Sequence, residues 1–337
     1  HRPVSELSRA LDLWNSSNKS EHPLRSRLAR LRCEAFVRTG QVDDLEASAK
    51  YLMEHGDNDS DLAFGGWAYG LAVSMLGRDE QAVEIWNDAL ERAVKNEERV
   101  VEARILRSLG WVAVRIGDAS EEPEANLRRS HELFSEAGTV SDAALSMTIL
   151  AELLRLQGNV DEALYLLQSA QSTLKQAEDL NGFAHATILL AELHRNQGRF
   201  DDAEALYKDA LSTTKRTGHL NQYLCLLNLA YVALERRDAL NAEKYLVAAS
   251  AGLRKMKQEF FLLHTDAALV AAYAMANDHS LEETLVRVEN TMNIEVADTD
   301  GGRCLELAGD ALKENPELAE RCLRAAMVLT PKNADEQ

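Results

Sequence analysis

Three arginines and one tryptophan, Arg104, Arg107, Trp111 and Arg115, follow one another in steps of three or four residues. This spacing places the four side chains on one face of a helix. The planar guanidinium of arginine binds a carboxylate or a phosphate at two points, and it also stacks on indole rings. We therefore interpret this face as a candidate binding surface for an acidic group.

The sequence lacks the motifs of the common catalytic sites. It contains no His-Glu-x-x-His, no phosphate-binding loop, no Gly-x-Ser-x-Gly and no regular metal-ligand spacing. His185 and His194 lie nine residues apart on one predicted helix, which is not the spacing of a metal pair. We expect a protein that is not an enzyme and that holds no metal and no cofactor.

The element that carries the arginines recurs along the chain. Small residues repeat at intervals of 40, 41, 40 and 39 residues, at Gly70, Gly110, Ala151, Ala191 and Ala230. A turn glycine keeps nearly the same period, at Gly40, Gly77, Gly117, Gly158 and Gly198. Each period therefore predicts two helices joined by a turn, with small residues where the helices approach closely. One such hairpin is too small to bury its apolar stripe alone, so the hairpins must stack into a solenoid.

This pattern resembles the tetratricopeptide repeat. The resemblance rests on the Gly-x-Φ-x-x-Ala turn, from Gly158 to Ala163 and from Gly198 to Ala203, and it covers Leu24 to Leu329. The usual repeat has about 34 residues, so each helix here should be longer by most of a turn. Such long repeats are similar to those of kinesin light chains and of the regulatory arms of bacterial signalling ATPases and kinases. Towards the C-terminus other residues replace the turn glycine, namely Arg237, Asp278-His279 and Asn315-Pro316.

The resemblance implies an all-α fold, a right-handed superhelical solenoid of antiparallel helix hairpins. We expect at least about fourteen helices in seven or more hairpins, and essentially no strand. The predicted organisation is an N-terminal capping helix over residues 1–23, the solenoid over 24–295, and a C-terminal capping hairpin and tail over 296–337.

In such a superhelix the first helix of each hairpin lines the concave groove, and the repeat register predicts which side chains lie there. The predicted partner-binding residues are Phe64, Trp67, Arg104, Arg107, Trp111, Arg115, Arg27, Arg30, Arg155, Arg195, Tyr231 and Tyr273. Arginine dominates the N-terminal part. Leucine and tyrosine dominate the C-terminal part, which we expect to prefer apolar side chains of the partner.

An alternative interpretation applies to some of these arginines. Arg155 and Arg195 each follow a glutamate by three residues, Glu152 and Glu192, and such pairs usually belong to a solvated helix surface. We favour this interpretation for both. The arginines that flank Trp111 have no acid on their own stripe, so for them we favour ligand binding.

Composition limits the partners and the compartment. The formal net charge of −18 disfavours nucleic acid, which needs a basic surface. The sequence has no apolar run of membrane length and no signal-peptide start. Its four cysteines show no paired spacing, which predicts buried thiols rather than a disulfide framework or a zinc site. We expect a cytoplasmic protein without membrane contact.

Two functions remain open at this point. The first is an interaction scaffold that binds an acidic and apolar segment of a partner protein or peptide in the groove. The second is a ligand- or peptide-sensing regulatory arm of a larger signalling ATPase, kinase or protease. The chain begins at His1 rather than at methionine, as expected for an excised domain or a processed chain. The Lys and Asn pattern of chaperone-binding repeats and the DNA-binding helices of bacterial pheromone receptors are not visible in the sequence.

Overall fold

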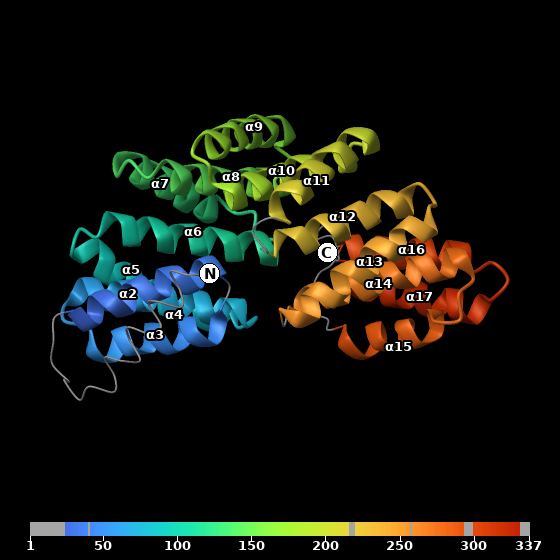
Figure 1. Cartoon of the computed structure of the whole chain (residues 1–337), viewed down its shortest axis with the longest axis horizontal. Helices are drawn as coiled ribbons and strands as arrows, with labels where there is room; N and C mark the ends of the chain where they lie inside the picture. The colour runs from blue at the N-terminus through green and yellow to red at the C-terminus, as the bar shows by residue number, and fades with distance from the viewer. Residues whose placement is uncertain (1–23, 40, 216–219, 257, 293–298, 331–337) are drawn as a thin grey trace. The chain divides into compact units, whose positions relative to one another are not determined.

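The computed structural model describes residues 24–39, 41–215, 220–256, 258–292 and 299–330. Within these residues the chain is all-α, with sixteen helices and no strand. It divides into two compact units, His1–Leu166 and Leu167–Gln337. Seven helix hairpins lie wholly within one unit or the other, so the predicted solenoid of antiparallel hairpins is confirmed for the described residues (Figure 1). The predicted capping helix over 1–23 lies outside the described residues.

Unit 1 contains three complete hairpins and one further helix. In chain order its helices are α2 (Leu24–Thr39), α3 (Val42–His55), α4 (Asp59–Met75), α5 (Asp79–Lys95), α6 (Arg99–Ile116), α7 (Glu121–Glu136) and α8 (Val140–Leu156). The boundary between the units passes through α9 (Val160–Gln176). The first helices α4 and α6 each pack on the second helix of their own hairpin and on that of the preceding one, and α8 packs on α7.

Unit 2 contains four complete hairpins. Its helices are α10 (Leu180–Asn196), α11 (Phe200–Thr214), α12 (Asn221–Glu235), α13 (Ala239–Lys255), α14 (Glu259–Ala276), α15 (Leu281–Thr291), α16 (Thr299–Ala311) and α17 (Pro316–Leu329). The first helices α12 and α14 pack as their counterparts in unit 1 do, whereas α16 does not.

A residue in the left-handed backbone region ends the first helix of each regular hairpin. The turn glycines take this conformation, with φ of 77° at Gly77 and 82° at Gly158. Glycine adopts it without steric cost, which explains the period read in the sequence. Where glycine is missing, Arg237 adopts φ of 60° and Asn277 adopts φ of 54°. In the hairpin of α14 the turn residue is thus Asn277, one position before the predicted Asp278-His279, and asparagine tolerates this region better than most residues.

A second series of left-handed residues joins one hairpin to the next. Glu97, Gly138 and Glu178 have φ of 56°, 71° and 55°. They fall about midway between the turn glycines, so within the described regular hairpins the backbone reverses about every 20 residues. The sequence does not reveal this series, because glutamate occupies two of its three positions.

Small residues let the two helices of a hairpin approach closely. A Cβ atom on Gly110 of α6 would lie 2.5 Å from Cγ of Leu127 in α7, and one on Gly70 would collide with the indole of Trp86. Ala163, Ala203 and Ala242 are completely buried. The register of small residues that the sequence predicted is therefore the register of helix contact.

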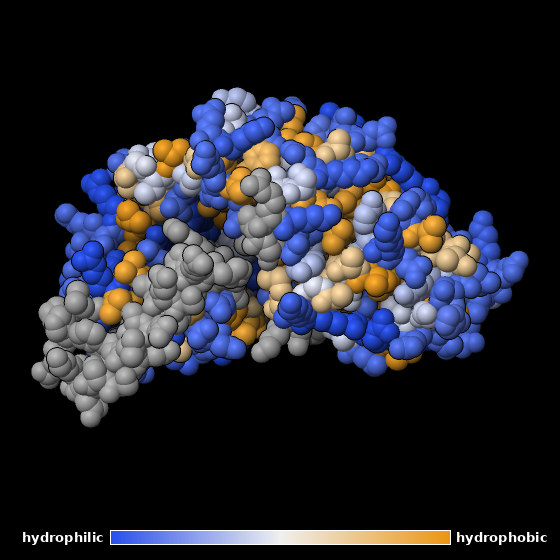
Figure 2. All heavy atoms as spheres, in the orientation of Figure 1, coloured by the Kyte–Doolittle hydropathy of each residue, from blue (hydrophilic) through white to orange (hydrophobic). Residues whose placement is uncertain are grey.

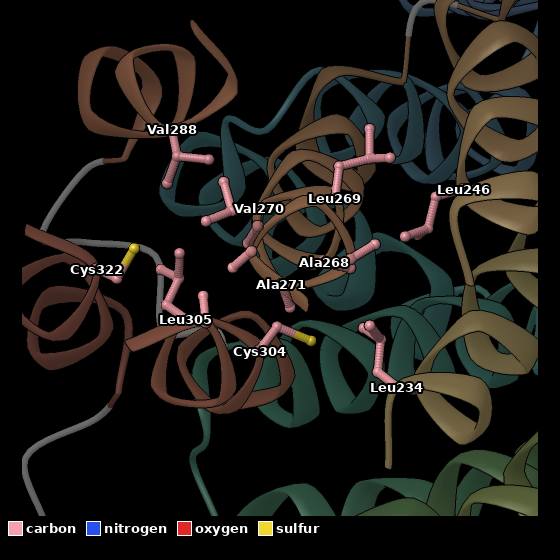
Figure 3. Close-up of a cluster of buried hydrophobic side chains, with 14 of the residues drawn as sticks. Leu234, Leu246, Ala268, Leu269, Val270, Ala271, Val288, Cys304, Leu305 and Cys322 are labelled. Atoms are coloured by element: carbon pink, nitrogen blue, oxygen red, sulfur yellow. The ribbon is translucent and has the colours of Figure 1, made fainter. Parts of the chain in front are cut away.

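Each unit has its own apolar core. In unit 1 the largest fully buried side chains are Trp86, Phe36, Phe64 and Phe134. The largest cluster of unit 2 joins the hairpin of α12 and α13 to the last two hairpins (Figure 3). Outside the cores the visible surface is mostly hydrophilic, with apolar side chains in small separate groups (Figure 2). No helix of the described chain has the length and apolar character needed to cross a membrane.

The last hairpin packs differently from the others. Its first helix, α16, packs on α14 and contacts α12, which are themselves first helices, whereas α17 contacts α15. Small residues make this close packing possible, because Gly301, Gly302 and Ala308 of α16 are buried and so are Ala267, Ala268, Ala271 and Ala272 of α14. Consequently α16 lies on the face that the first helices of unit 2 present.

Candidate partner-binding site

An aromatic pair on α4 forms the centre of a candidate site in unit 1. Phe64 and Trp67 lie one turn apart and meet edge to face, with ring centroids 5.3 Å apart. The indole Nε1 of Trp67 donates to Ser108 Oγ of α6 at 3.3 Å. The backbone carbonyl of Trp67 accepts a hydrogen bond from Trp86 Nε1 at 3.0 Å. The pair is therefore held rigidly by its own hairpin and by the next one.

Two arginines from neighbouring first helices stack on this pair. The guanidinium carbon of Arg30, on α2, lies 4.6 Å from the centroid of Phe64, and that of Arg104, on α6, lies 4.8 Å from the centroid of Trp67. Such stacking is favourable because the ring face is negative. Cations from two different helices thus cover the aromatic pair.

Carboxylates of the same unit neutralise both arginines. Arg30 Nη1 lies 3.2 Å from Asp61 Oδ1, and Asp61 is buried in the first turn of α4. Arg104 offers both Nη atoms to a single oxygen of Glu34, at 3.4 Å each. Burial lowers the pKa of Arg104, and Glu34 offsets part of this shift. We name Arg30, Glu34, Phe64, Trp67 and Arg104 the arginine–aromatic cluster.

Arg107 and Arg115 tie helices together. Arg107 Nη1 donates to Asp142 Oδ1 in the first turn of α8 at 2.8 Å, and its guanidinium lies 4.9 Å from the ring of Phe134. Arg115 Nη2 forms an ion pair with Asp79 in the first turn of α5 and donates to Ser74 Oγ at 2.8 Å. The pKa of Arg115 is lowered by burial, and the attraction of Asp79 offsets part of this shift.

Arg104, Arg107 and Arg115, which flank Trp111, each form an ion pair with an acid that is not on their own stripe. The acids lie on other helices, at Glu34, Asp142 and Asp79, so the pattern within α6 does not show them. Three ion pairs thus connect α6 to α2, α8 and α5.

The remaining predicted residues of unit 1 have separate surroundings. Arg155 donates two hydrogen bonds to Glu152, at 2.6 and 3.0 Å, which confirms the pairing within one helix that we favoured. Arg27 is exposed on α2, and Trp111 is partly buried on α6.

In unit 2 the predicted residues are Arg195, Tyr231 and Tyr273. Arg195 pairs with Asp300 of α16 rather than with Glu192, contrary to expectation, because α16 brings its carboxylate from 105 positions away. Tyr231 is 4% exposed and lies beneath the Arg195 guanidinium. Tyr273 is partly buried, and burial raises the pKa of its hydroxyl.

The apolar C-terminal stripe is consequently not an open surface. Leu227, Leu234 and Leu269 are buried in the same cluster as Cys304 and Leu305 of α16. In Figure 3, Cys304 and Leu305 share this cluster with Leu234 and Leu269. The expectation that this end receives apolar side chains of a partner is therefore corrected, because the chain's own last hairpin fills it.

Sequence reasoning did not identify several contact residues that lie one repeat period from their partners. Trp67 contacts Ser108, and Ser74 contacts Arg115, in both cases 41 positions further along the chain. Asn221 donates to the carbonyl of Asn181, 40 positions earlier. Equivalent positions of adjacent first helices thus face each other, so residues one period apart are candidates for contact. The acids, which are not spaced by one period, carry no such signal.

Among the described residues, no group of three or more His, Cys, Asp or Glu side chains is placed to hold a metal ion. All four cysteines are buried thiols that are not joined in disulfides, as predicted. The arrangement in unit 1 is suited to binding, because it combines rigid aromatic rings with arginines that already hold carboxylates.

Comparison with known proteins supports the fold. A family model described as tetratricopeptide repeat matches residues 184–217. The comparison with curated protein sequences gave no match.

Solved structures of similar architecture are distant in sequence. A Rap protein complexed with competence and sporulation factor is 14% identical, with a TM-score of 0.73 over 97% of this chain and 93% of that one. The regulator NprR in complex with its cognate peptide NprX is 13% identical, with a TM-score of 0.61 over 96% and 94%.

A third similar structure is a signal transduction ATPase with a tetratricopeptide-repeat sensor from Pyrococcus horikoshii. It is 11% identical, with a TM-score of 0.57, and the match covers 93% of this chain but 53% of that protein. The helix hairpins, their turn residues and these matches agree: the chain has the fold of a tetratricopeptide-repeat solenoid, and its residues 184–217 match the tetratricopeptide-repeat family model.

Proposed function

We propose that this protein is a non-catalytic, cytoplasmic interaction protein that binds an extended peptide segment against the first helices of unit 1. The binding residues are Arg30, Phe64, Trp67 and Arg104 of the arginine–aromatic cluster, and Glu34 is the internal carboxylate that the bound segment displaces. The bound segment supplies a carboxylate to Arg104 and an apolar side chain beside it.

The observation that carries this proposal is the loose contact between Arg104 and Glu34. One oxygen of Glu34 lies 3.4 Å from both Nη atoms, and the Glu34 side chain is 38% exposed. A good two-point pair has distances of about 2.7–2.9 Å. A carboxylate that engages both Nη atoms at the shorter distance therefore competes well with Glu34. The Trp67 and Phe64 rings support the Arg104 guanidinium, which lies 4.8 and 5.6 Å from their centroids.

Apolar surface lies close to this arginine along the same helices. Trp111 is two turns after Arg104 on α6, Leu71 is one turn after Trp67 on α4, and both are partly exposed. We place an aromatic or aliphatic side chain, next to the acidic residue of the partner, against Trp111 and Leu71. This pairing of a charged contact with an apolar anchor is typical of binding hot spots.

The complexes named among the similar structures support a peptide ligand. The Rap protein is in complex with competence and sporulation factor, and NprR is in complex with NprX. The alternative function, a sensing arm of a larger signalling protein, is supported by the ATPase whose sensor is built of tetratricopeptide repeats. Both functions use the same binding surface, and they differ in whether an effector domain responds.

The test is selection of linear peptides from a random display library on the purified chain. We expect the selected peptides to share an acidic residue or a free carboxyl terminus next to an apolar residue. Arg104→Ala should weaken their binding at least about tenfold, because it removes the buried partner of the charge. Arg99→Ala is the matched control, since Arg99 lies on the same helix and pairs with Glu136 on an exposed surface.

Glu34→Gln gives the sharper result. It removes the internal competitor and should raise affinity for acidic peptides by up to about fivefold, the value of a partly exposed ion pair. Glu136→Gln should have no effect. Equal affinities in wild type, Arg104→Ala and Glu34→Gln would show that the partner binds elsewhere.

A further inference from the structure

The contact between Arg195 and Asp300 has the geometry of a bound carboxylate. Arg195 Nη1 donates to Oδ1 at 2.9 Å, and Nη2 donates to Oδ2 at 2.8 Å. This is the two-point geometry with which arginine recognises a carboxylate. It differs from the looser contact of Arg104, where a single oxygen serves both nitrogens.

In this ion pair Arg195 is the buried, supported partner and Asp300 is the more exposed one. The arginine side chain is 8% exposed, whereas the aspartate side chain is 35% exposed. The guanidinium lies 5.2 Å from the ring centroid of Tyr231, which supports it from α12. Burial is the largest single influence and lowers the pKa of Arg195, but the combined attraction of Asp300, Tyr207 and Glu192 outweighs burial and raises this pKa. A buried guanidinium without such a partner would be strongly destabilising.

The rest of α16 follows Asp300 along the first helices of unit 2. Arg303, one turn later, forms an ion pair with Glu235 at the end of α12. Leu305 and Ala308 are completely buried in the cluster that includes α14. Asp300, Arg303 and Leu305 thus combine an acidic contact, a polar contact and an apolar anchor on one segment.

We infer that Arg195, supported by Tyr231, is a carboxylate-binding site that the chain fills with its own Asp300, so that α16 acts as an internal ligand on the first helices of unit 2. One consequence rests on the proposed function: peptide binding is confined to unit 1, because the corresponding face of unit 2 is occupied. The site itself does not depend on that function.

The test measures hydrogen–deuterium exchange of the full chain by mass spectrometry, with no partner present. In Asp300→Ala, amide exchange in α16 should accelerate at least about tenfold, because the buried arginine loses its counter-charge. Asp310→Ala is the matched control, since Asp310 lies on the same helix and is exposed. Asp300→Asn keeps the volume and one oxygen of the side chain, and it serves if Asp300→Ala does not fold.

Chemical rescue identifies the site. Sodium acetate should slow exchange of α16 in the Asp300 variant at least about threefold relative to sodium chloride at the same ionic strength, because acetate restores the two-point contact. Wild type should not respond, and neither should a double variant that also carries Arg195→Met.

Two results would overturn the inference. One is exchange in the Asp300 variants that matches that of Asp310→Ala, and the other is equal exchange in acetate and in chloride. Because no peptide is used, failure here is distinct from failure of the Arg104 experiment.

Discussion

Gly110 of α6 provides the clearest test of how the hairpins pack. A Cβ atom at this position would lie 2.5, 2.6 and 2.8 Å from Cγ, Cδ2 and Cδ1 of Leu127, which is completely buried. Carbon atoms in good contact are about 3.5–4.0 Å apart, so Leu127 would have to move by roughly 1 Å. Rotation of its side chain brings no relief, because the clash includes Cγ itself.

Two opposing terms set the magnitude for Gly110→Ala. Alanine is favoured over glycine inside a helix by about 1 kcal/mol. Overpacking a well-filled core costs about 1–3 kcal/mol, and the three simultaneous clashes place Gly110→Ala in the upper part of that range. We therefore expect the free energy of unfolding to fall by about 1–2 kcal/mol. Ala151 occupies the equivalent position of the next repeat, so alanine at this repeat position is compatible with the fold when its neighbour leaves room.

A double-mutant cycle with Leu127→Ala tests the cause. Leu127→Ala alone should cost about 2–5 kcal/mol. In that background Gly110→Ala should be neutral or stabilising by up to about 1 kcal/mol, because the clash is gone and the helix preference remains. Urea unfolding followed by circular dichroism measures all four proteins, and hydrogen exchange shows whether the loss stays within unit 1, as expected for a repeat protein. If Gly110→Ala stabilises the wild type as much as it stabilises Leu127→Ala, the packing argument is wrong.

Three further predictions concern turns, thiols and the small-residue register. Arg237→Gly should raise the melting temperature, because a non-glycine residue with φ of 60° carries about 1–2 kcal/mol of strain. Arg237→Ala keeps this strain and should change the melting temperature little. Equal shifts of the melting temperature in the two variants would contradict the argument. Burial raises the pKa of the Cys33 and Cys225 thiols to about 12 and that of Cys322 to about 11. The unfolded chain releases these protons near pH 8.5 and the folded chain retains them, so the free energy of unfolding should fall as pH rises above about 8.5. Urea midpoints that stay constant up to pH 10 would exclude this pH dependence. Ala203→Leu should cost about 1–3 kcal/mol by overpacking a fully buried position, and an unchanged melt would show that the register is wrong.

The regular part of the fold could be predicted from the sequence because its causes are local. A left-handed turn residue is needed after each first helix, and glycine marks most of these turns. The close approach of two helices needs small residues, and these recur with the same period. Where another residue tolerates the turn, as Asn277 and Glu97 do, the local signal weakens and the predicted position shifts or is missed.

The partners of the candidate site residues could not be predicted in this way. Arg104, Arg107 and Arg115 were recognised as one helix face, but their carboxylates lie on three other helices, at positions set by how the hairpins stack. The sequence period identifies positions that face each other one repeat apart, such as Trp67 and Ser108. It does not identify contacts between unlike positions.

The sequence by itself determined that this protein is a stack of helix hairpins, because turn geometry and close helix packing each demand particular residues at a fixed period. Only the tertiary structure decided which surface stays open. The packing of α16 on α14 depends on buried area, and the ion pair between Arg195 and Asp300, 105 positions apart, joins α16 to α10. No local pattern encodes a contact over that separation, so the covered face of unit 2 and the exposed pairing of Glu34 with Arg104 in unit 1 emerge only from the folded chain.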